Sequence, residues 1–322
     1  MPKVSICIPV YNVEKYIGRC ARSLFDQTLD DIEYIFVNDC SPDRSMSVLE
    51  RVIKEYPKRK PQIQIINHNT NQGSAAARNS CLSVATGEYI GWCDSDDWVE
   101  PQMYEKMYEK GVAEKADIVY CGIYFEFPNK QIRCDCNEDA QPFQHLQMDI
   151  FFSSLCNKLI RRSLYIRHNI SFYKGINMWE DLSVTIRLRY FSGKTVRVPF
   201  LFYHYNRDIT NSISIPQANH LVQKMRCADI VEDFFRAQNK EDDFFLVIQL
   251  LKFQSKETLL LCPQLRDVKR WKTIHQESNK YIWKYKSIPF HLRIMYWLAA
   301  HGGSGIACFL IDLKQKIRRL IR

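Results

Sequence analysis

Residues 89–100 read YIGWCDSDDWVE, and in this stretch a short apolar run leads directly into a cluster of acids. Cys93 is followed by three carboxylates within four positions, Asp94, Asp96 and Asp97. Carboxylates this close repel one another, and burying them without partners is costly. The cluster becomes favourable when a hard cation, Mg²⁺ or Mn²⁺, binds it together with the phosphate oxygens of a substrate. A simpler alternative is that the acids open the helix that follows, because Asp stabilises helix N-termini.

The apolar run before Asp94 is the last of four short apolar segments that alternate with helical patterns. The strands are expected at 4–10, 32–39, 63–67 and 88–93, and the helices at 13–28, 45–56 and 73–86. Strands separated by helices imply βαβ crossovers and a parallel sheet. We therefore predict an α/β fold with a mainly parallel, Rossmann-like sheet and helices on both faces.

Polar residues follow each of these four strands. They are Tyr11-Asn12, Asn38-Asp39, the segment 69–73 and the acids at 94–97. Ligands of parallel sheets bind outside the carboxyl ends of the strands. Loops are polar in any protein, so one such cluster alone carries little information. Four clusters at consecutive strand ends predict a binding site at that edge of the sheet.

The rest of the chain predicts a few more strands and then only helices. Strands are expected at 117–127, 131–136, 195–199 and 201–206, a helix at 178–193, and helices alone after about residue 218. We therefore predict a domain over 1–215, with a first half at 1–115 and a second half at 116–215. A helical region at 216–322 would follow.

The chain has 322 residues, 46% hydrophobic and 25% charged, as is common for a soluble globular protein. Its net charge of +9 is concentrated near the end, because residues 266–322 hold 13 Lys and Arg against 3 Asp and Glu. Residues 294–311 carry no Lys, Arg or Glu and no Asp, but HGGSG interrupts them, so a spanning helix is not expected. The alternatives are a segment lying on an anionic membrane surface and a helical bundle that packs on the preceding domain. Charge alone would also permit nucleic-acid binding, but no recognised module accompanies it, so we expect no nucleic-acid partner.

The twelve cysteines are scattered and contain no CxxC pair. This pattern is typical of reduced, mostly buried thiols in a cytoplasmic protein. The first residues, MPKVSICIPVYN, do not have the pattern of a signal peptide. We therefore expect a cytoplasmic protein, located at the inner face of the membrane if the basic segment binds lipid.

Four motifs in the first half occur together in a fixed order. They are PVYN (9–12), VNDCSPD (37–43), NQGSAAARN (71–79) and CDSDD (93–97). Together they resemble the nucleotide-sugar-binding half of family 2 glycosyltransferases, which have the GT-A fold. One departure is Cys40, where many members have glycine, and it suggests a slightly different turn.

Motifs in the second half continue this resemblance. They are Asn157-Lys158-Leu159 with Arg161-Arg162, then Trp179-Glu180-Asp181, then YHYNRDITNSIS at 203–214. These look like the acceptor-side half of the same family, so the resemblance extends from about residue 3 to residue 215. It implies an enzyme of the hexosyltransferase type that uses a divalent cation.

The resemblance implies a set of nucleotide contacts. Pro9, Val10 and Tyr11 would line the base and ribose, with Tyr11 stacked on uracil. Asp39 would accept a hydrogen bond from the uracil N3–H, which favours UDP-sugars. Asn71 and Arg78 would lie near the nucleotide, although Arg78 could instead only pair with an acidic strand end. Asp94, next to Ser95, would bind the ribose, and Asp96 would ligate the metal, with Asp94 as a second candidate ligand.

The resemblance also implies that Asp181 is the general base. An ordinary ionised aspartate is a weak base, so desolvation and the adjacent Glu180 should raise its pKa. The carboxylate would then deprotonate an acceptor hydroxyl as that oxygen attacks the anomeric carbon, which inverts the configuration. A structural alternative is that Glu180 and Asp181 only open a helix.

Two further residues and the partners complete the prediction. His204 and Arg207 follow the last predicted strand and could reach the metal or the diphosphate, although a lone histidine is more often structural. The acceptor would be a growing surface glycan or a lipid-linked glycan. A nucleotidyl or phosphoryl transferase is the alternative enzyme, since clustered aspartates also serve attack at phosphorus. A non-catalytic glycan-binding scaffold is the alternative outside enzymes. The sequence does not identify the sugar or the linkage.

Overall fold

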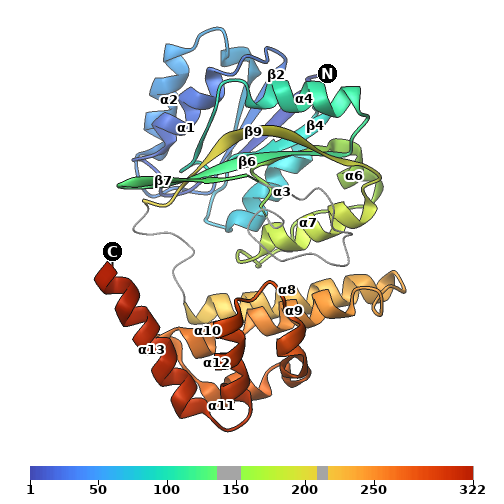
Figure 1. The fold of residues 1–322 in the computed structure, drawn as a ribbon. Coiled ribbons are helices and arrows are strands. Elements are labelled where there is room, and N and C mark those ends of the chain that lie inside the picture. Colours follow the sequence, from blue (N-terminus) through green and yellow to red (C-terminus); the bar gives the residue numbers. More distant parts are fainter. Residues whose placement is uncertain (136–153, 209–216, 322) are drawn as a thin grey trace. The chain divides into compact units, whose positions relative to one another are not determined.

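The computed structural model describes residues 1–135, 154–208 and 217–321, and for 318–321 only the backbone. The chain divides into two compact units, which Figure 1 shows in blue to olive and in gold to red. The first unit contains the described residues up to 208, and the second contains those from 217 onwards. The predicted boundary at 215/216 lies outside the described residues.

The first half of the first unit contains a parallel sheet, and its strands and helices occur in the predicted order. Its strands are β1 (Val4–Val10), β2 (Ile32–Asn38), β3 (Ile63–Asn67) and β4 (Tyr89–Trp92), in the order β3-β2-β1-β4. The connecting helices are α1 (Ile17–Phe25), α2 (Ser45–Glu55) and α3 (Ser74–Val84). A short 3₁₀ turn, η1 (Lys60–Gln62), lies between α2 and β3. Because the strand order reverses after β3, right-handed crossovers put α1 and α2 on one face and α3 on the other, as Figure 1 shows.

The second half makes the sheet mixed. The strands are β5 (Trp98–Val99), β6 (Ile118–Phe127), β7 (Lys130–Cys134), β8 (Lys158–Arg161) and β9 (Thr195–Asn206). Strand β8 lies antiparallel between β4 and β6, and β9 runs parallel to β6 with a shift of register near Gly122. The helices are α4 (Met103–Ala113), α6 (Arg162–Arg167) and α7 (Glu180–Phe191). The two strands predicted at 195–199 and 201–206 are wrong as separate elements, because Phe200 continues β9.

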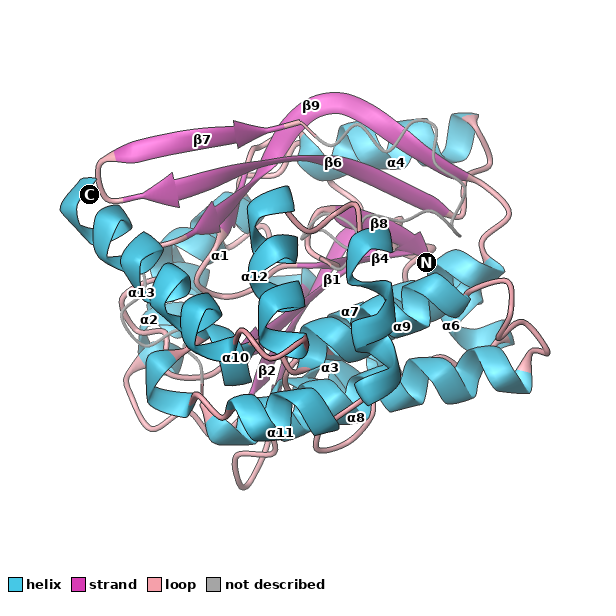
Figure 2. Ribbon diagram, turned by 60° about the horizontal axis from the view of Figure 1, so that its bottom comes forward, coloured by secondary structure: helices cyan, strands magenta, loops and turns pink. Residues whose placement is uncertain are grey.

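The second unit consists of helices, as predicted. They are α8 (Ala218–Ala237), α9 (Phe245–Ser255), α10 (Thr258–Leu261), η3 (Pro263–Leu265), α11 (Val268–Thr273), η4 (Gln276–Lys284), α12 (Phe290–Ala300) and α13 (Ser304–Ile321). Figure 2 draws these helices, like those of the first unit, in cyan. Phe253, Trp271 and Tyr296 form a buried aromatic group at the centre of this unit. The predicted interruption at HGGSG is confirmed, because α12 ends at Ala300 and α13 begins at Ser304. In the part of the chain that the structure describes, no helix is both long and apolar enough to cross a membrane.

The thiol prediction is confirmed where it can be checked. Of the cysteines in the described ranges, seven are buried and only Cys40 is exposed. Cys136 lies outside those ranges.

Candidate active site

The acidic turn after β4 is tied to the end of β9. The Asp97 carboxylate is buried, and it accepts hydrogen bonds from the Tyr203 hydroxyl at 2.5 Å and the Asn206 N–H at 2.7 Å. Burial, and then repulsion by Asp96, raise the pKa of Asp97 well above its ordinary value. Helix α4 begins only at Met103, so the alternative that Asp97 caps a helix is wrong. Asp97 instead fixes the shape of the turn.

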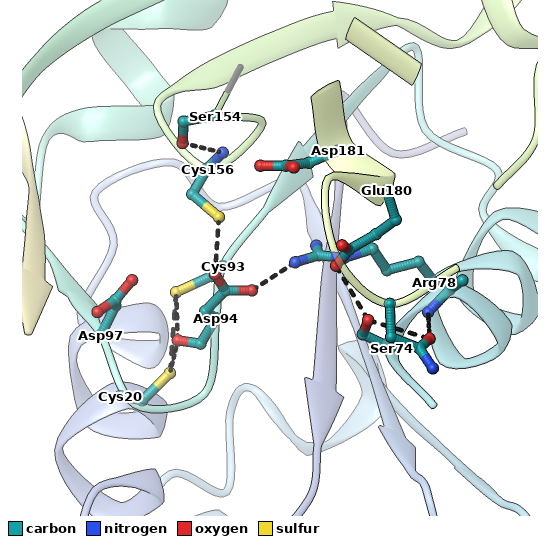
Figure 3. Close-up of polar contacts among 12 residues, drawn as sticks. Cys20, Ser74, Arg78, Cys93, Asp94, Asp97, Ser154, Cys156, Glu180 and Asp181 are labelled. Atoms are coloured by element: carbon teal, nitrogen blue, oxygen red, sulfur yellow. Dashed lines mark hydrogen bonds and ion pairs between the residues drawn. The ribbon is translucent and has the colours of Figure 1, made fainter. Parts of the chain in front are cut away.

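Asp94 lies in a salt bridge with Arg78 across the strand end. An Arg78 Nη2–H donates to the Asp94 carboxylate at 2.7 Å, and the Cys156 thiol donates to its other oxygen at 3.4 Å. Figure 3 shows this arrangement, with Asp94 between Cys156 and Arg78. Of the two predictions for Arg78, pairing with an acidic strand end therefore describes the contact in this structure. Its predicted place near the nucleotide stays a prediction. Nothing in the sequence pointed to Cys156, which lies 62 residues beyond Asp94.

Arg78 is buried on helix α3 with unused hydrogen-bonding capacity. Its Nε is 3.8 Å from the Glu180 carboxylate, beyond hydrogen-bond distance, and neither Nε nor Nη1 has a hydrogen-bond partner among the described residues. Burial would lower the pKa of this guanidinium, but Asp94 and Glu180 raise it well above its ordinary value. Arg78 is thus a fixed cation between two carboxylates. A buried donor without a partner is unfavourable, so these N–H groups suit an oxygen-rich ligand.

The start of α7 carries the Glu180-Asp181 pair. Glu180 accepts a hydrogen bond from the Ser74 hydroxyl at 2.9 Å, which ties α7 to the start of α3. The backbone at Trp179 has φ +64°, a left-handed conformation that is costly for a bulky residue and that occurs preferentially at functional sites. Burial raises the pKa of Glu180, and Arg78 partly offsets this effect.

Asp181 has a strongly perturbed carboxyl group. Burial, and then repulsion by Glu180, raise its pKa to about 7. This confirms the predicted direction and both predicted causes. One oxygen, Oδ1, accepts a hydrogen bond from the N–H of Leu182 at 2.8 Å. In the view of Figure 3, Asp181 lies between Cys156 and Glu180. Its role as base stays a prediction.

Asp96, like Asp94, is half-buried in the acidic turn. Burial, followed by repulsion from Asp94, raises the pKa of Asp96 to about 7. Its main-chain oxygen accepts a hydrogen bond from the Asn206 side chain at 3.1 Å, so the residue is held in place through its backbone. Ser95 is buried between the two acids. Within the described ranges, no three His, Cys, Asp or Glu side chains are already arranged as a metal site.

Asp39 organises the loop that follows β3. Its two carboxylate oxygens accept hydrogen bonds from the N–H groups of Gln72 at 2.9 Å and Gly73 at 2.7 Å, and His68 Nδ1 lies 2.7 Å away. A carboxylate has about four acceptor positions, so these three contacts do not exhaust it. Sequence reasoning missed His68, and its contact with Asp39 was not evident because 29 residues separate the two. The predicted contact of Asp39 with uracil remains a prediction.

The end of β1 presents Tyr11 and buries Val10. Tyr11 is 46% exposed, so it is not a core residue, whereas Val10 is fully buried. Only the backbone of Val10 could therefore line a nucleotide, and its carbonyl already accepts the Asp39 N–H at 3.0 Å. Pro9 is partly exposed. The backbone at Cys40 has φ +56°, a left-handed conformation that glycine adopts without strain. This conformation accounts for the glycine that many members of the resembled family have at this position.

His204 is held by carboxylates and aromatic rings, and its predicted metal role stays a prediction. Its Nδ1 lies 2.7 Å from Glu126 and its Nε2 lies 2.9 Å from Glu100, so a carboxylate faces each ring nitrogen. Its ring also stacks between Trp98 and Tyr124. The surroundings are those of a structural histidine. Two other residues predicted to lie near the nucleotide or the diphosphate, Asn71 and Arg207, are both exposed. Asn71 lies in the loop after β3, and Arg207 directly follows β9.

The family of this chain follows from a comparison with known proteins. Residues 5–168 match the family model described as "Glycosyl transferase family 2". The chain belongs to this family. It is 32% identical to EpsH of Bacillus subtilis (strain 168), which is named as a putative glycosyltransferase, over 76% of this chain and 72% of EpsH. Family 2 members are glycosyltransferases, and this chain is therefore an enzyme of that class.

Solved structures show the fold of this family 2 chain. One is S. aureus TarS 1-349 in complex with UDP-GlcNAc, with a TM-score of 0.67 at 16% identity over 98% of this chain and 92% of that one. Another is the mannosyltransferase PcManGT from Pyrobaculum calidifontis in complex with GDP-Man and Mn²⁺, with a TM-score of 0.52 at 14% identity over 98% and 88%. At such identities the likeness concerns the fold alone. The first unit therefore has the predicted GT-A architecture, followed by a helical unit.

Proposed function

We propose that this protein transfers a sugar from a nucleotide-sugar, preferably a UDP-sugar, to a hydroxyl of a glycan or lipid-linked acceptor, with inversion at the anomeric carbon. The observation that carries the proposal is the group of carboxylates at the strand ends. Asp94, Asp96 and Asp181 gather near one buried cation, Arg78, and two of the three have pKa values raised to about 7. A site with this excess of acids suits an incoming cation and a proton transfer.

The donor would bind at the ends of β1, β2 and β3. Tyr11 offers an exposed aromatic ring for stacking on the base, and Asn71 lies in the exposed loop that Asp39 holds. The preference for uracil depends on Asp39 using its remaining acceptor position for the N3–H. TarS, which shares the fold, has been solved in complex with UDP-GlcNAc, and a UDP-sugar donor here is compatible with that complex.

A divalent cation fits the residues present at Asp96. Carboxylate oxygens are the ligands that Mg²⁺ and Mn²⁺ prefer, and such cations often take one or two carboxylates plus substrate phosphates. The repulsion between Asp94 and Asp96 would be relieved by positive charge between them. Asp96 would hold the cation, with Asp94 as the second ligand. When bound, the cation would stabilise the negative charge on the leaving diphosphate.

Asp181 would take the proton from the acceptor hydroxyl. Since Oδ1 accepts the Leu182 N–H, the proton would go to Oδ2. A pKa near 7 makes the carboxylate a stronger base than an ordinary aspartate while leaving much of it ionised at neutral pH. Glu180 would sustain this pKa by repulsion. Arg78 would position Asp94 and offer its unused N–H groups to the donor.

The acceptor class and the location follow from the family resemblance and from the charge. We propose residues 1–215 as the catalytic domain, with donor-binding and acceptor-side halves at 1–115 and 116–215, and 216–322 as a basic helical domain. Growing surface polysaccharides are commonly carried on lipid, and the 13 basic residues of 266–322 suit an anionic membrane surface. The enzyme would then work in the cytoplasm at the inner face of the membrane.

A turnover assay tests the proposal. The purified protein is incubated with Mn²⁺, a panel of UDP-sugars and glycan acceptors, and free UDP is measured against intact donor. Release of UDP that depends on one sugar is the expected result. Release of pyrophosphate would indicate a nucleotidyl transferase, and tight donor binding without turnover under any acceptor would indicate a scaffold.

A further inference from the structure

The second unit exposes an unusual set of large apolar side chains on its last two helices. On α12 these are Phe290, Ile294 and Trp297, at helical spacings of four and three. On α13 they are Ile306, Phe309, Leu313 and Ile317, which also follow one another at three or four residues. All seven are between 36% and 65% exposed. Each helix therefore carries a continuous apolar stripe in addition to its packed side.

The stripes lie opposite the sides that build the core. On α13, Ala307 and Ile311 are buried, and Asp312 bonds Arg266 of the same unit. At 100° per residue, Phe309 and Leu313 point about 160° away from Ile311. On α12, Tyr296 and Ala299 are buried in the core, so Phe290 and Ile294 face away from it. We call these two stripes together the outer face.

A tryptophan next to the two stripes, Trp283, enlarges the outer face. Trp283 of η4 is 45% exposed, and its ring lies 6.1 Å from Phe290 and 6.5 Å from Trp297 between centroids. Tryptophan is enriched where proteins meet the boundary between lipid headgroups and acyl chains. By contrast, Val222 of α8 and Leu246 of α9 are exposed singly, as is common on any protein surface.

The charges around the outer face are almost all positive. Residues 276–321 contain eight Lys and Arg and only two acids. Both acids are already paired, Glu277 with Lys252 at 3.1 Å and Asp312 with Arg266 at 2.6 Å. Lys284, Lys286 and Lys316 are exposed cations beside the stripes. A second copy of the chain would bring a like-charged face against this one, whereas anionic lipid complements it.

We propose that the outer face of η4, α12 and α13 binds an anionic phospholipid bilayer, with the two helices lying in the plane of the interface. Apolar stripes flanked by cations and bearing tryptophan are the features of interfacial helices. The binding site is then a composite surface rather than the basic end of the chain alone. It would hold the enzyme beside a lipid-linked acceptor, but the lipid binding does not depend on the proposed transfer reaction.

Vesicle sedimentation with the full chain tests this proposal. The wild type is expected to bind vesicles of phosphatidylglycerol and phosphatidylcholine at least about tenfold more tightly than vesicles of phosphatidylcholine alone. The triple variant Ile306→Ser/Phe309→Ser/Leu313→Ser should lose about tenfold or more of this affinity, because it removes three apolar anchors. The matched control Val222→Ser/Leu246→Ser removes exposed apolar groups elsewhere on the same unit and should stay within about twofold.

A charge variant and a fluorescence measurement make the test independent of folding. The double variant Lys284→Glu/Lys316→Glu should weaken vesicle binding by about fivefold or more for each lysine replaced. The control Lys269→Glu on α11 should weaken vesicle binding less. Brominated lipid should quench tryptophan emission in the wild type and much less in Trp283→Phe/Trp297→Phe. The proposal is overturned if the wild type does not bind anionic vesicles, or if the triple and charge variants bind as the wild type does. It is also overturned if the outer face proves to join two copies, so that the triple variant dissociates a dimer that ignores vesicles.

Discussion

Each of the two units buries basic side chains, and one from each unit, Lys256 and Arg78, are held in opposite ways. Lys256, in the second unit, is fully buried, and its Nζ donates to Ile274 O at 2.6 Å, His275 O at 3.2 Å and Asn279 Oδ1 at 2.8 Å. Arg78, in the first unit, lies between two carboxylates but keeps two nitrogens without hydrogen-bond partners among the described residues. When protonated, Lys256 has three N–H groups and three acceptors, so it completes a structure, and burial lowers its pKa to about 7. The guanidinium keeps capacity for a ligand, so it belongs to a site.

The largest effect in this comparison should come from Asp181, the carboxylate proposed to act as base beside Arg78. Asp181→Asn should lower the rate of sugar transfer about 10²- to 10⁴-fold, because general-base catalysis contributes on that scale. UDP-sugar affinity, measured by calorimetry, should stay within about twofold. The exposed Asp31→Asn is the matched control and should leave both quantities unchanged. An unchanged transfer rate in Asp181→Asn would reject Asp181 as base.

A smaller effect is expected when the buried guanidinium itself is changed. Arg78→Lys keeps the charge but cannot span Asp94 and Glu180, and it removes the unused N–H groups, so transfer should fall about ten- to a hundredfold. Arg22→Lys alters an exposed pair with Glu55 and should have little effect. Equal transfer rates for these two lysine variants would mean that Arg78 is structural, like Lys256.

The pH dependence of transfer should report the raised pKa of Asp181. A base must be deprotonated, so the rate at saturating donor and metal should rise with pH and level off above about 7. Below that pH it should fall by about tenfold per pH unit. The residual rate of Asp181→Asn should lack this dependence. A wild-type profile that is flat from about pH 5 to 7 would show that no group with the pKa of Asp181 limits transfer.

The smallest effect on transfer is expected at Lys256. Lys256→Met leaves three buried acceptors without a donor and should lower the free energy of unfolding by about 1–3 kcal/mol, measured by urea denaturation. The transfer rate per folded molecule should stay within about twofold. Lys269→Met, on exposed surface of α11, should change neither property. A large loss of transfer in Lys256→Met at unchanged stability would erase the distinction between the two cations.

The elements of the first half could be predicted from sequence because local patterns determine them. Strand β1 occupies the predicted residues, and α3 begins one residue after the predicted start at Gly73. No local pattern predicted β8, which has only four residues and inserts antiparallel between β4 and β6. Such a pairing depends on contacts distant in the chain. For the same reason two predicted strands proved to be the single strand β9.

The candidate site was predictable in its residue types and less so in their contacts. The acids at 94–97 and the pair at 180–181 stood out because clustered carboxylates need a reason. Their partners did not stand out, since Tyr203 lies 106 residues from Asp97, and Cys156 lies 62 residues from Asp94. The carboxylate partners of His204, Glu100 and Glu126, did not stand out either, because only the sheet brings them to it. Its metal role stays a prediction.

The most direct test concerns the cation that Asp96 would hold with the donor. UDP affinity is measured by titration calorimetry with and without Mn²⁺, in the wild type and in Asp96→Asn. We predict that Mn²⁺ tightens UDP binding at least about tenfold in the wild type and has little effect in the variant. Identical UDP affinities with and without Mn²⁺ in the wild type, or a full metal effect in Asp96→Asn, would contradict the account.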